Sequence, residues 1–211
     1  ASFTFAAVGD AGQSGTFVEQ RQSNHPVFDE LRNRALAEDW LMAVDLGDAH
    51  YRDIGSGVHV PGHDLATFRE AYDDLLTFNG TLGLEARQGR CWRNLPITYF
   101  WDDHDYGPNN SDRTHPLRDA AAQAHRERWP SYPMPLSSGP IFHDFQVGRV
   151  LFIASDVRYD RDPNDDPADP DKTMLGARQR AWMEALLTSA QAEFLVWLQP
   201  DQWTRPGGTD N

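Results

Sequence analysis

The chain has 211 residues, of which 39% are hydrophobic and 11% aromatic, so it is long and apolar enough to bury a substantial core and is not a disordered segment. Its 19 Lys and Arg stand against 32 Asp and Glu, and the net charge of −13 repels nucleic acids and anionic membranes except at a local positive centre. No apolar run reaches the roughly 20 residues of a membrane span, and the single cysteine, Cys91, excludes an internal disulfide.

The order of apolar segments predicts an α/β fold. Five short, nearly continuous apolar runs predict strands that are covered on both faces: residues 3–8, 40–46, 96–101, 149–155 and 193–198. Segments with helical spacing or helix-start residues predict helices over residues 26–39, 64–78, 115–129 and 175–190. A hairpin turn is expected at Val147 and Gly148, so the β-sheets should be mixed and flanked by helices. The 211 residues are interpreted as one domain.

Other local features favour structural interpretations. The Asp- and Pro-rich segment 156–172 lacks the spacing of an EF-hand and is expected to be an exposed, solvated loop. Cys91 is expected to be a small core residue. The Gly-, Pro- and Ser-rich segments 55–62 and 128–140 are either simple connections or the rim of a pocket.

Carboxylates follow three of the predicted strands. Asp10 follows the first strand in GDAG; Asp48 follows the second in GDAHY, with Tyr51 three residues later; the third strand runs into WDDHD, which contains Asp103 and His104. Ligands bind beyond the carboxyl ends of strands in α/β sheets, so parallel neighbours would bring these groups together. A single Asp after a strand is usually a turn or helix cap, but converging carboxylates need cations, and two metal ions would offset their repulsion. A tyrosine phenolate suits a trivalent cation, because its reference pKa of about 10 must be lowered by a strong positive charge.

These motifs resemble those of the calcineurin-like metallophosphoesterases, which include the purple acid phosphatases. The chain is most similar to the alkaline phosphatase D family. The similar blocks, in the family's order, are residues 24–31, 44–54, 97–114, 147–161 and 174–190. The specific part of the resemblance is GDAHY together with WDDHDYGPNN.

The resemblance implies a calcineurin-like metallophosphoesterase sandwich that carries two metal ions, Fe³⁺ with Ca²⁺ or with another divalent ion such as Zn²⁺ or Mn²⁺. Asp10, which stands where many members have Cys, would ligate the first metal. Asp48 would bridge both metals, Tyr51 would complete the first metal's shell, and Asp103 would ligate the second. His104 would hydrogen-bond the substrate or protonate its leaving group.

Two further residues are weaker candidates from the same resemblance. Asn110 and Arg158 would contact the phosphate or support the metal ligands, and an ion pair between Arg158 and Asp156 is the structural alternative for the arginine.

The resemblance implies metal-dependent hydrolysis of phosphomonoesters or phosphodiesters, with a metal-bound hydroxide as the nucleophile. The family's later block, a G-D-x-H or G-H-x-H element, is absent before Asn211, so the domain is interpreted as C-terminally incomplete. A non-catalytic relative that binds metal or phosphate is the alternative. The family favours a secreted, periplasmic or cell-surface location, and the sequence leaves the substrate and the oligomeric state open.

Overall fold

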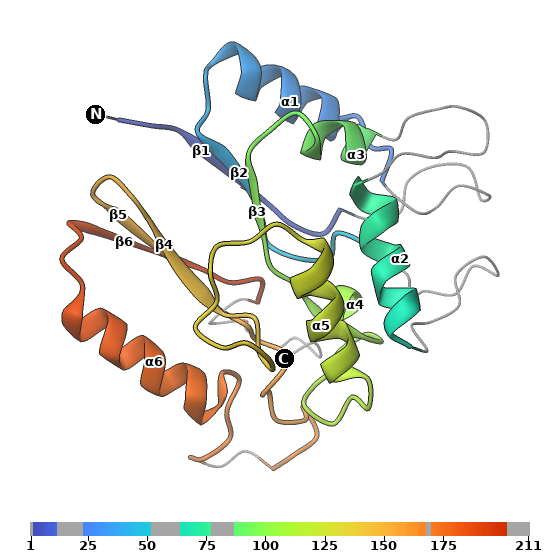
Figure 1. The fold of residues 1–211 in the computed structure, drawn as a ribbon, viewed down its shortest axis with the longest axis vertical. Coiled ribbons are helices and arrows are strands. Elements are labelled where there is room, and N and C mark those ends of the chain that lie inside the picture. Colours follow the sequence, from blue (N-terminus) through green and yellow to red (C-terminus); the bar gives the residue numbers. More distant parts are fainter. Residues whose placement is uncertain (1, 12–22, 52–63, 77–86, 168–169, 202–211) are drawn as a thin grey trace.

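The computed structural model describes residues 2–11, 23–51, 64–76, 87–167 and 170–201 (Figure 1). These described ranges contain two three-stranded sheets. The first has the order β1 (Phe5–Val8), β2 (Met42–Asp45) and β3 (Ile97–Tyr99), with all strands parallel. The second has the order β4 (His143–Val147), β5 (Val150–Ala154) and β6 (Phe194–Leu198), with β4 antiparallel and β6 parallel to β5. The segment 55–62 lies outside the described residues.

Six helices connect the strands in the described part of the chain: α1 (Val27–Ala37), α2 (Leu65–Leu76), α3 (Arg87–Trp92), α4 (Asp103–Tyr106), α5 (Arg118–Arg128) and α6 (Gly176–Ser189). All five predicted strands and all four predicted helices are confirmed, and most of their ends lie slightly inside the predicted bounds. The predicted end of helix 64–78 lies outside the described residues. The sequence did not predict α3 and α4, because elements of six and four residues are too short to show a helical period. No helix in the described ranges has both the length and the apolar character needed to span a membrane.

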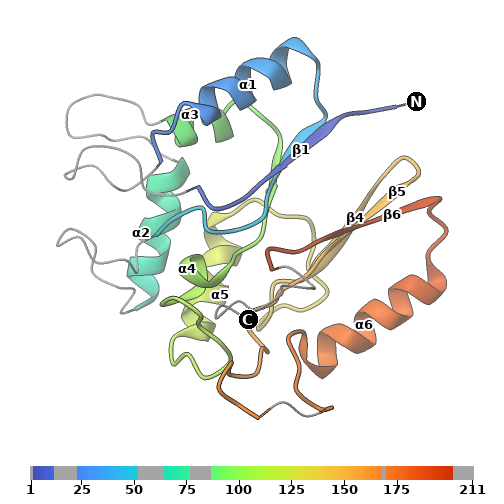
Figure 2. The ribbon, with the colours of Figure 1, turned by 180° about the vertical axis from the view of Figure 1, so that it is seen from behind.

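The two sheets face each other between outer helices (Figures 1 and 2). Phe5 of β1 packs edge-on against Phe152 of β5, with 5.3 Å between the ring centroids, so one apolar core joins the sheets. Helices α1 and α3 lie on the far side of the first sheet. Helix α6 covers the second sheet, where Leu151 and Ile153 pack against Met183. The predicted α/β class is therefore confirmed. The prediction of mixed sheets holds for the second sheet but is wrong for the first, whose described strands are all parallel.

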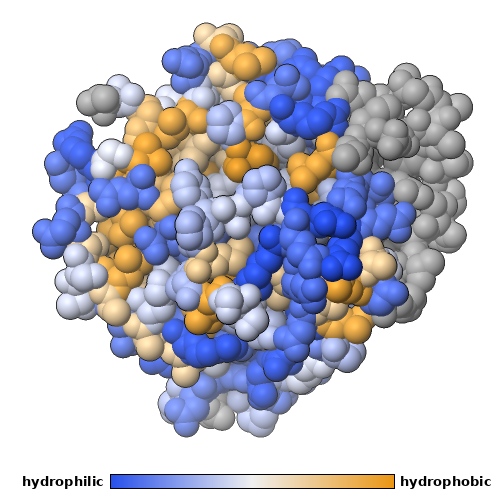
Figure 3. Space-filling model, in the orientation of Figure 1, coloured by the Kyte–Doolittle hydropathy of each residue, from blue (hydrophilic) through white to orange (hydrophobic). Residues whose placement is uncertain are grey.

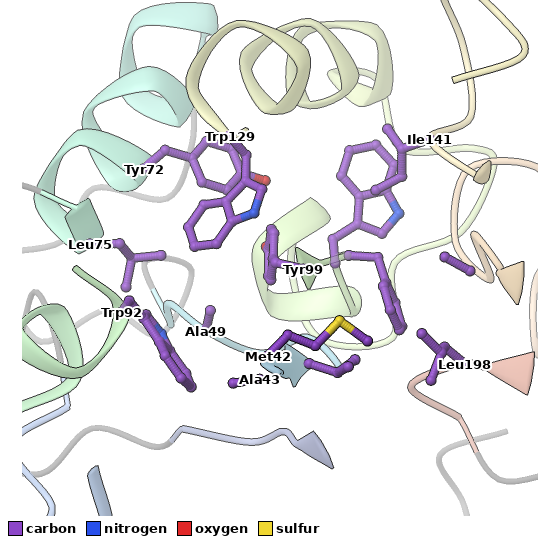
Figure 4. Close-up of a cluster of buried hydrophobic side chains, with 14 of the residues drawn as sticks. Met42, Ala43, Ala49, Tyr72, Leu75, Trp92, Tyr99, Trp129, Ile141 and Leu198 are labelled. Atoms are coloured by element: carbon purple, nitrogen blue, oxygen red, sulfur yellow. The ribbon is translucent and has the colours of Figure 1, made fainter. Parts of the chain in front are cut away.

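Aromatic side chains fill the core between β3, α2 and α5 (Figure 4). The ring centroid of Tyr99 lies 4.5 Å from that of Trp129 and 6.0 Å from that of Tyr72. Cys91 is fully buried in the same core, which confirms its structural interpretation. This packing fixes the position of β3 and therefore the position at which the following loop begins.

The predicted hairpin is confirmed, because β4 ends at Val147, which pairs with Val150, and Gly148 has a φ of +57° in the turn. The prediction that every strand is covered on both faces holds for β2 but is wrong for β6. Phe194 and Trp197 of β6 are 56% and 40% exposed, since β6 is an edge strand of the sheet that the described residues form. Figure 3 shows hydrophobic surface on the side of the molecule where this sheet lies.

The expectation that segment 156–172 is a solvated loop is wrong for its first part. Residues 156–159 are buried, whereas residues 165–167 are exposed. The cause is the side chain of Asp156, which accepts hydrogen bonds from the indole of Trp101 and from the backbone N–H groups of Ile141 and Tyr159. The loop after β5 is thereby folded back against the loop after β3.

A glycine fixes the contact between the loops after β2 and β3, and its replacement should be costly. Gly47 has a φ of +102°, and a Cβ there would lie 2.5 Å from the backbone N of Asp102. We expect Gly47→Ala to lower the free energy of unfolding by about 2–4 kcal/mol, because backbone must move in addition to the conformational strain.

Gly148→Ala is the matched control, since its φ of +57° is also positive but nothing lies within 4 Å of the added Cβ. It should cost only about 1–2 kcal/mol. Urea unfolding followed by circular dichroism measures both values. Equal losses in the two variants would show that close contact at Gly47 is unimportant.

Candidate metal centre

The loops after β2 and β3 bring three potential metal ligands together. Asp48, Asp103 and His104 each offer one ligand atom, and these atoms lie within 4.8 Å of one another. The parallel pairing of β2 with β3 causes this arrangement, because both loops leave the same edge of the sheet. Two carboxylate oxygens and an imidazole nitrogen are donors that hard and borderline cations accept, so the residues fit a metal ion.

The loop after β1 lies against this group through its backbone. The N–H of Asp10 donates to the carbonyl oxygen of Gly47 at 3.1 Å, and the N–H of Ala11 donates to that of Asp48 at 3.0 Å. Asp10 and Asp48 both have positive φ, 53° and 55°, which Asp tolerates better than most residues. Among the described residues, the carboxylate of Asp10 is not part of the three-donor group.

Tyr51 joins the group from the β2 side. Its ring centroid lies 4.6 Å from that of His104, and its hydroxyl hydrogen-bonds the carboxylate of Asp48. Burial, followed by the negative charges of Asp48 and Asp10, raises the pKa of the Tyr51 hydroxyl. A phenolate at this position therefore needs a strong neighbouring positive charge.

Asp105 holds the site together, and no functional role was assigned to it from the sequence. Its fully buried carboxylate accepts the N–H of Asp48 at 2.6 Å, that of His50 at 2.9 Å and that of Asp102 at 3.2 Å. One side chain thus fixes the loop after β2 to the loop after β3. The available signal was its position three residues after Asp102, where helix-capping carboxylates occur.

The acids at this edge raise one another's pKa values. Burial is the largest effect on Asp48, and the charges of Asp105, Asp102 and Asp103 raise its pKa further. Burial likewise raises the pKa of Asp45 to about 8. Such crowding of carboxyl groups favours the binding of cations, which would relieve the repulsion.

Arg158 supplies positive charge beside the donors. The residue is only 2% exposed. Its Nε donates a hydrogen bond to the carboxylate of Asp102 at 2.5 Å, and its Nη2 lies 3.9 Å from a carboxylate oxygen of Asp103. The alternative of an ion pair with Asp156 is wrong, because Asp156 accepts the backbone N–H of Arg158 at 2.9 Å while the guanidinium reaches Asp102. The Nη1 of Arg158 is buried and has no hydrogen-bond partner among the described residues.

Asn110 contacts the centre through its main chain. Its N–H donates to the second carboxylate oxygen of Asp103 at 2.6 Å, and its φ of 59° turns the chain so that this bond can form. The residue therefore orients Asp103, and this contact does not depend on its side chain.

Comparison with known proteins identifies the family. Residues 23–205 match the family described as PhoD-like phosphatase. The chain belongs to the PhoD-like phosphatase family. The resemblance to the alkaline phosphatase D family is thereby confirmed.

The fold of this PhoD-like chain is similar to that of a solved structure. A solved structure described as "Structure of PhoD" matches with a TM-score of 0.61 and 22% sequence identity, over 92% of this chain and 40% of that one. The present chain therefore spans about 40% of the length of that structure. A search of curated proteins found no match.

The crowded acids predict how the stability of the metal-free protein depends on pH. An acid with a higher pKa in the folded protein than in the unfolded one binds more protons when folded, so stability falls as pH rises between the two values. Asp45 has an unfolded pKa of about 4 and a folded pKa of about 8, and the pKa of Asp48 is raised in the same direction. We therefore expect the urea concentration at the midpoint of unfolding to decrease as the pH is raised from 7 to 8.5.

Within this pH range, the histidine with the largest opposite effect on stability, His125, no longer contributes. The buried His125 has its pKa lowered to about 3, so it increases stability with pH only up to its unfolded value of about 6.5. Saturating divalent or ferric ions should flatten or reverse the fall above pH 7, because a bound cation lowers the pKa of its carboxylate ligands. A midpoint that rises from pH 7 to 8.5 in chelator-treated protein would contradict the prediction.

Proposed function

We propose that this PhoD-like phosphatase hydrolyses phosphoesters with a metal centre at the carboxyl end of its parallel sheet. The observation that carries the proposal is the group of Asp48, Asp103 and His104, which gathers from two neighbouring strands in a chain of this family. We propose further that residues 1–211 form a metallophosphoesterase domain of the calcineurin-like type.

We propose that the centre holds two cations, as the resemblance of the motifs to the alkaline phosphatase D family implies. Asp10 and Tyr51 would hold the first cation, Asp103 the second, and Asp48 would contact both. Ferric iron with Ca²⁺, or with another divalent ion such as Zn²⁺ or Mn²⁺, suits a shell of carboxylates and a phenol. Bound cations would neutralise the charge of the phosphoryl oxygens and would increase the acidity of the attacking water.

Three residues of the chain would perform the remaining steps. The imidazole of His104 lies at the donor group and would give a proton to the oxygen of the departing alcohol. The buried Nη1 of Arg158 has an unused hydrogen, which would bind a phosphoryl oxygen and neutralise charge that develops there. The N–H of Asn110 would keep Asp103 oriented toward its cation.

A second candidate is a metal- or phosphate-binding relative that does not turn over esters. The observation that favours it is the small donor group: in the ranges that the structure describes, three donors gather within 4.8 Å, and Asp10 is not one of them. Elemental analysis combined with a phosphate titration separates the candidates, because a binding protein retains metal or phosphate without cleaving p-nitrophenyl esters.

Replacement of the shared ligand tests the hydrolase directly. Asp48→Asn keeps the size of the side chain but removes its charge, so it should lower metal-dependent hydrolysis of p-nitrophenyl phosphate and bis-p-nitrophenyl phosphate more than about 100-fold, the upper range for residues that merely support a ligand. Asp165→Asn, at an exposed position, is the control and should retain activity. Full activity of metal-loaded Asp48→Asn would refute the assignment.

The role of His104 is tested by leaving groups of different acidity. His104→Ala should lower kcat about 10²–10⁴-fold for phenyl phosphate, because the phenolate must be protonated as it leaves. The loss should be smaller for p-nitrophenyl phosphate, whose leaving group needs little protonation. Elemental analysis should find the wild-type metal content. Loss of a metal together with equal losses for both esters would make His104 a metal ligand instead.

A further inference from the structure

A cavity of about 400 Å³ lies beside the candidate centre, between the end of β1 and helices α1 and α3. Its walls are mainly apolar and include Val8, Phe28, Leu31 and Trp92. Cavities of this size hold small organic molecules in other proteins. It also reaches Asp10, a proposed ligand of the first cation, so a group attached to a phosphate at the centre could enter it.

A buried carboxyl group with an unused oxygen lines this cavity. Asp45 is 2% exposed, and its Oδ1 accepts the N–H of Gly47 at 3.1 Å. Its Oδ2 is buried and has no hydrogen-bond partner in the part of the chain that the structure describes. Asp45 pairs in register with Val8 of β1, and both residues line the cavity. A buried acceptor without a partner is costly, so a ligand that supplies positive charge or a donor would gain from this contact.

The charge of the lining restricts what the cavity can accept. The carboxyl groups of Asp10 and Asp45 and the imidazole of His25 line it, and none of the described lining residues is Lys or Arg. An anionic group such as a second phosphate would be repelled by the exposed carboxylate of Asp10. A cationic group would favour ionisation of Asp45, whose pKa burial raises to about 8. The aromatic pair Phe28 and Trp92, with ring centroids 5.5 Å apart, adds π-electron density to the wall, which attracts organic cations.

We propose that this cavity binds the alcohol portion of a phosphoester substrate and selects an amino-alcohol that carries a positively charged amine. The proposal rests on the proposed hydrolase function, since the phosphate of the same substrate occupies the metal centre. Asp45 pairs with the amine through its unused oxygen, while the aromatic and aliphatic walls surround the methylene and methyl groups.

Two diesters of the same shape test the selection. p-Nitrophenyl phosphorylcholine carries a quaternary amine, and p-nitrophenyl 3,3-dimethylbutyl phosphate replaces that nitrogen by carbon. For the metal-loaded chain, kcat/KM should favour the cationic diester by at least about tenfold, which corresponds to one charge interaction in a partly desolvated site. Asp45→Asn keeps the shape of the side chain and should reduce this ratio toward 1.

A second variant keeps the test decisive if Asp45→Asn does not fold. Val27 is 51% exposed and lines the cavity, so Val27→Trp should fill the space and also bring the ratio toward 1. Leu36→Gln is the control on the same helix; Leu36 is 60% exposed and does not line the cavity, and this variant should keep the wild-type ratio.

Equilibrium binding separates failure of this proposal from failure of the hydrolase function. Calorimetry with choline and with 3,3-dimethylbutanol measures the cavity without turnover. If no ester is cleaved but choline binds at least about tenfold more tightly, the cavity proposal stands and the hydrolase function fails. Equal binding of the two alcohols, or a preference that survives in both Asp45→Asn and Val27→Trp, overturns the cavity proposal.

Discussion

One fully buried carboxylate, that of Asp105, sets the geometry on which the site depends. It accepts backbone N–H groups from the loop after β2 and from the loop after β3, so the positions of Asp48 and Asp103 are linked through a single side chain. Burial of a carboxyl group is unfavourable, and the three hydrogen bonds offset part of that cost. The core around Tyr99 fixes β3 beneath these bonds.

The same constraint concentrates negative charge at one edge of the sheet. Arg158 compensates part of it, because its buried guanidinium pairs with Asp102 and lies near Asp103. Burial and the neighbouring acids nevertheless raise the pKa of Asp48. An acidic chain with a net charge of −13 would repel an anionic phosphoester, so a centre that accepts one needs cations at this edge.

The proposed centre and the proposed cavity use neighbouring strand ends. The loops after β2 and β3 carry the donor group, while β1 and the last residue of β2 face the cavity. Asp10, between them, would connect the site of the phosphate with the site of the alcohol. Under these proposals, the chemistry would take place beside β2 and β3, and the substrate would be selected beside β1, both at the carboxyl ends of the strands.

The sequence by itself determined the main strands and helices, the family and the acids that follow the first three strands, because apolar runs, helical spacing and the GDAHY and WDDHD motifs are local in the chain. It did not determine the partner of Arg158, the exposure of β6 or the burial of residues 156–159. Only the tertiary structure decided these features, together with the role of Asp105 and the unused oxygen of Asp45. The physical reason is that hydrogen bonds such as that between Asp48 and Asp105 join residues 57 positions apart, and burial depends on which elements pack together.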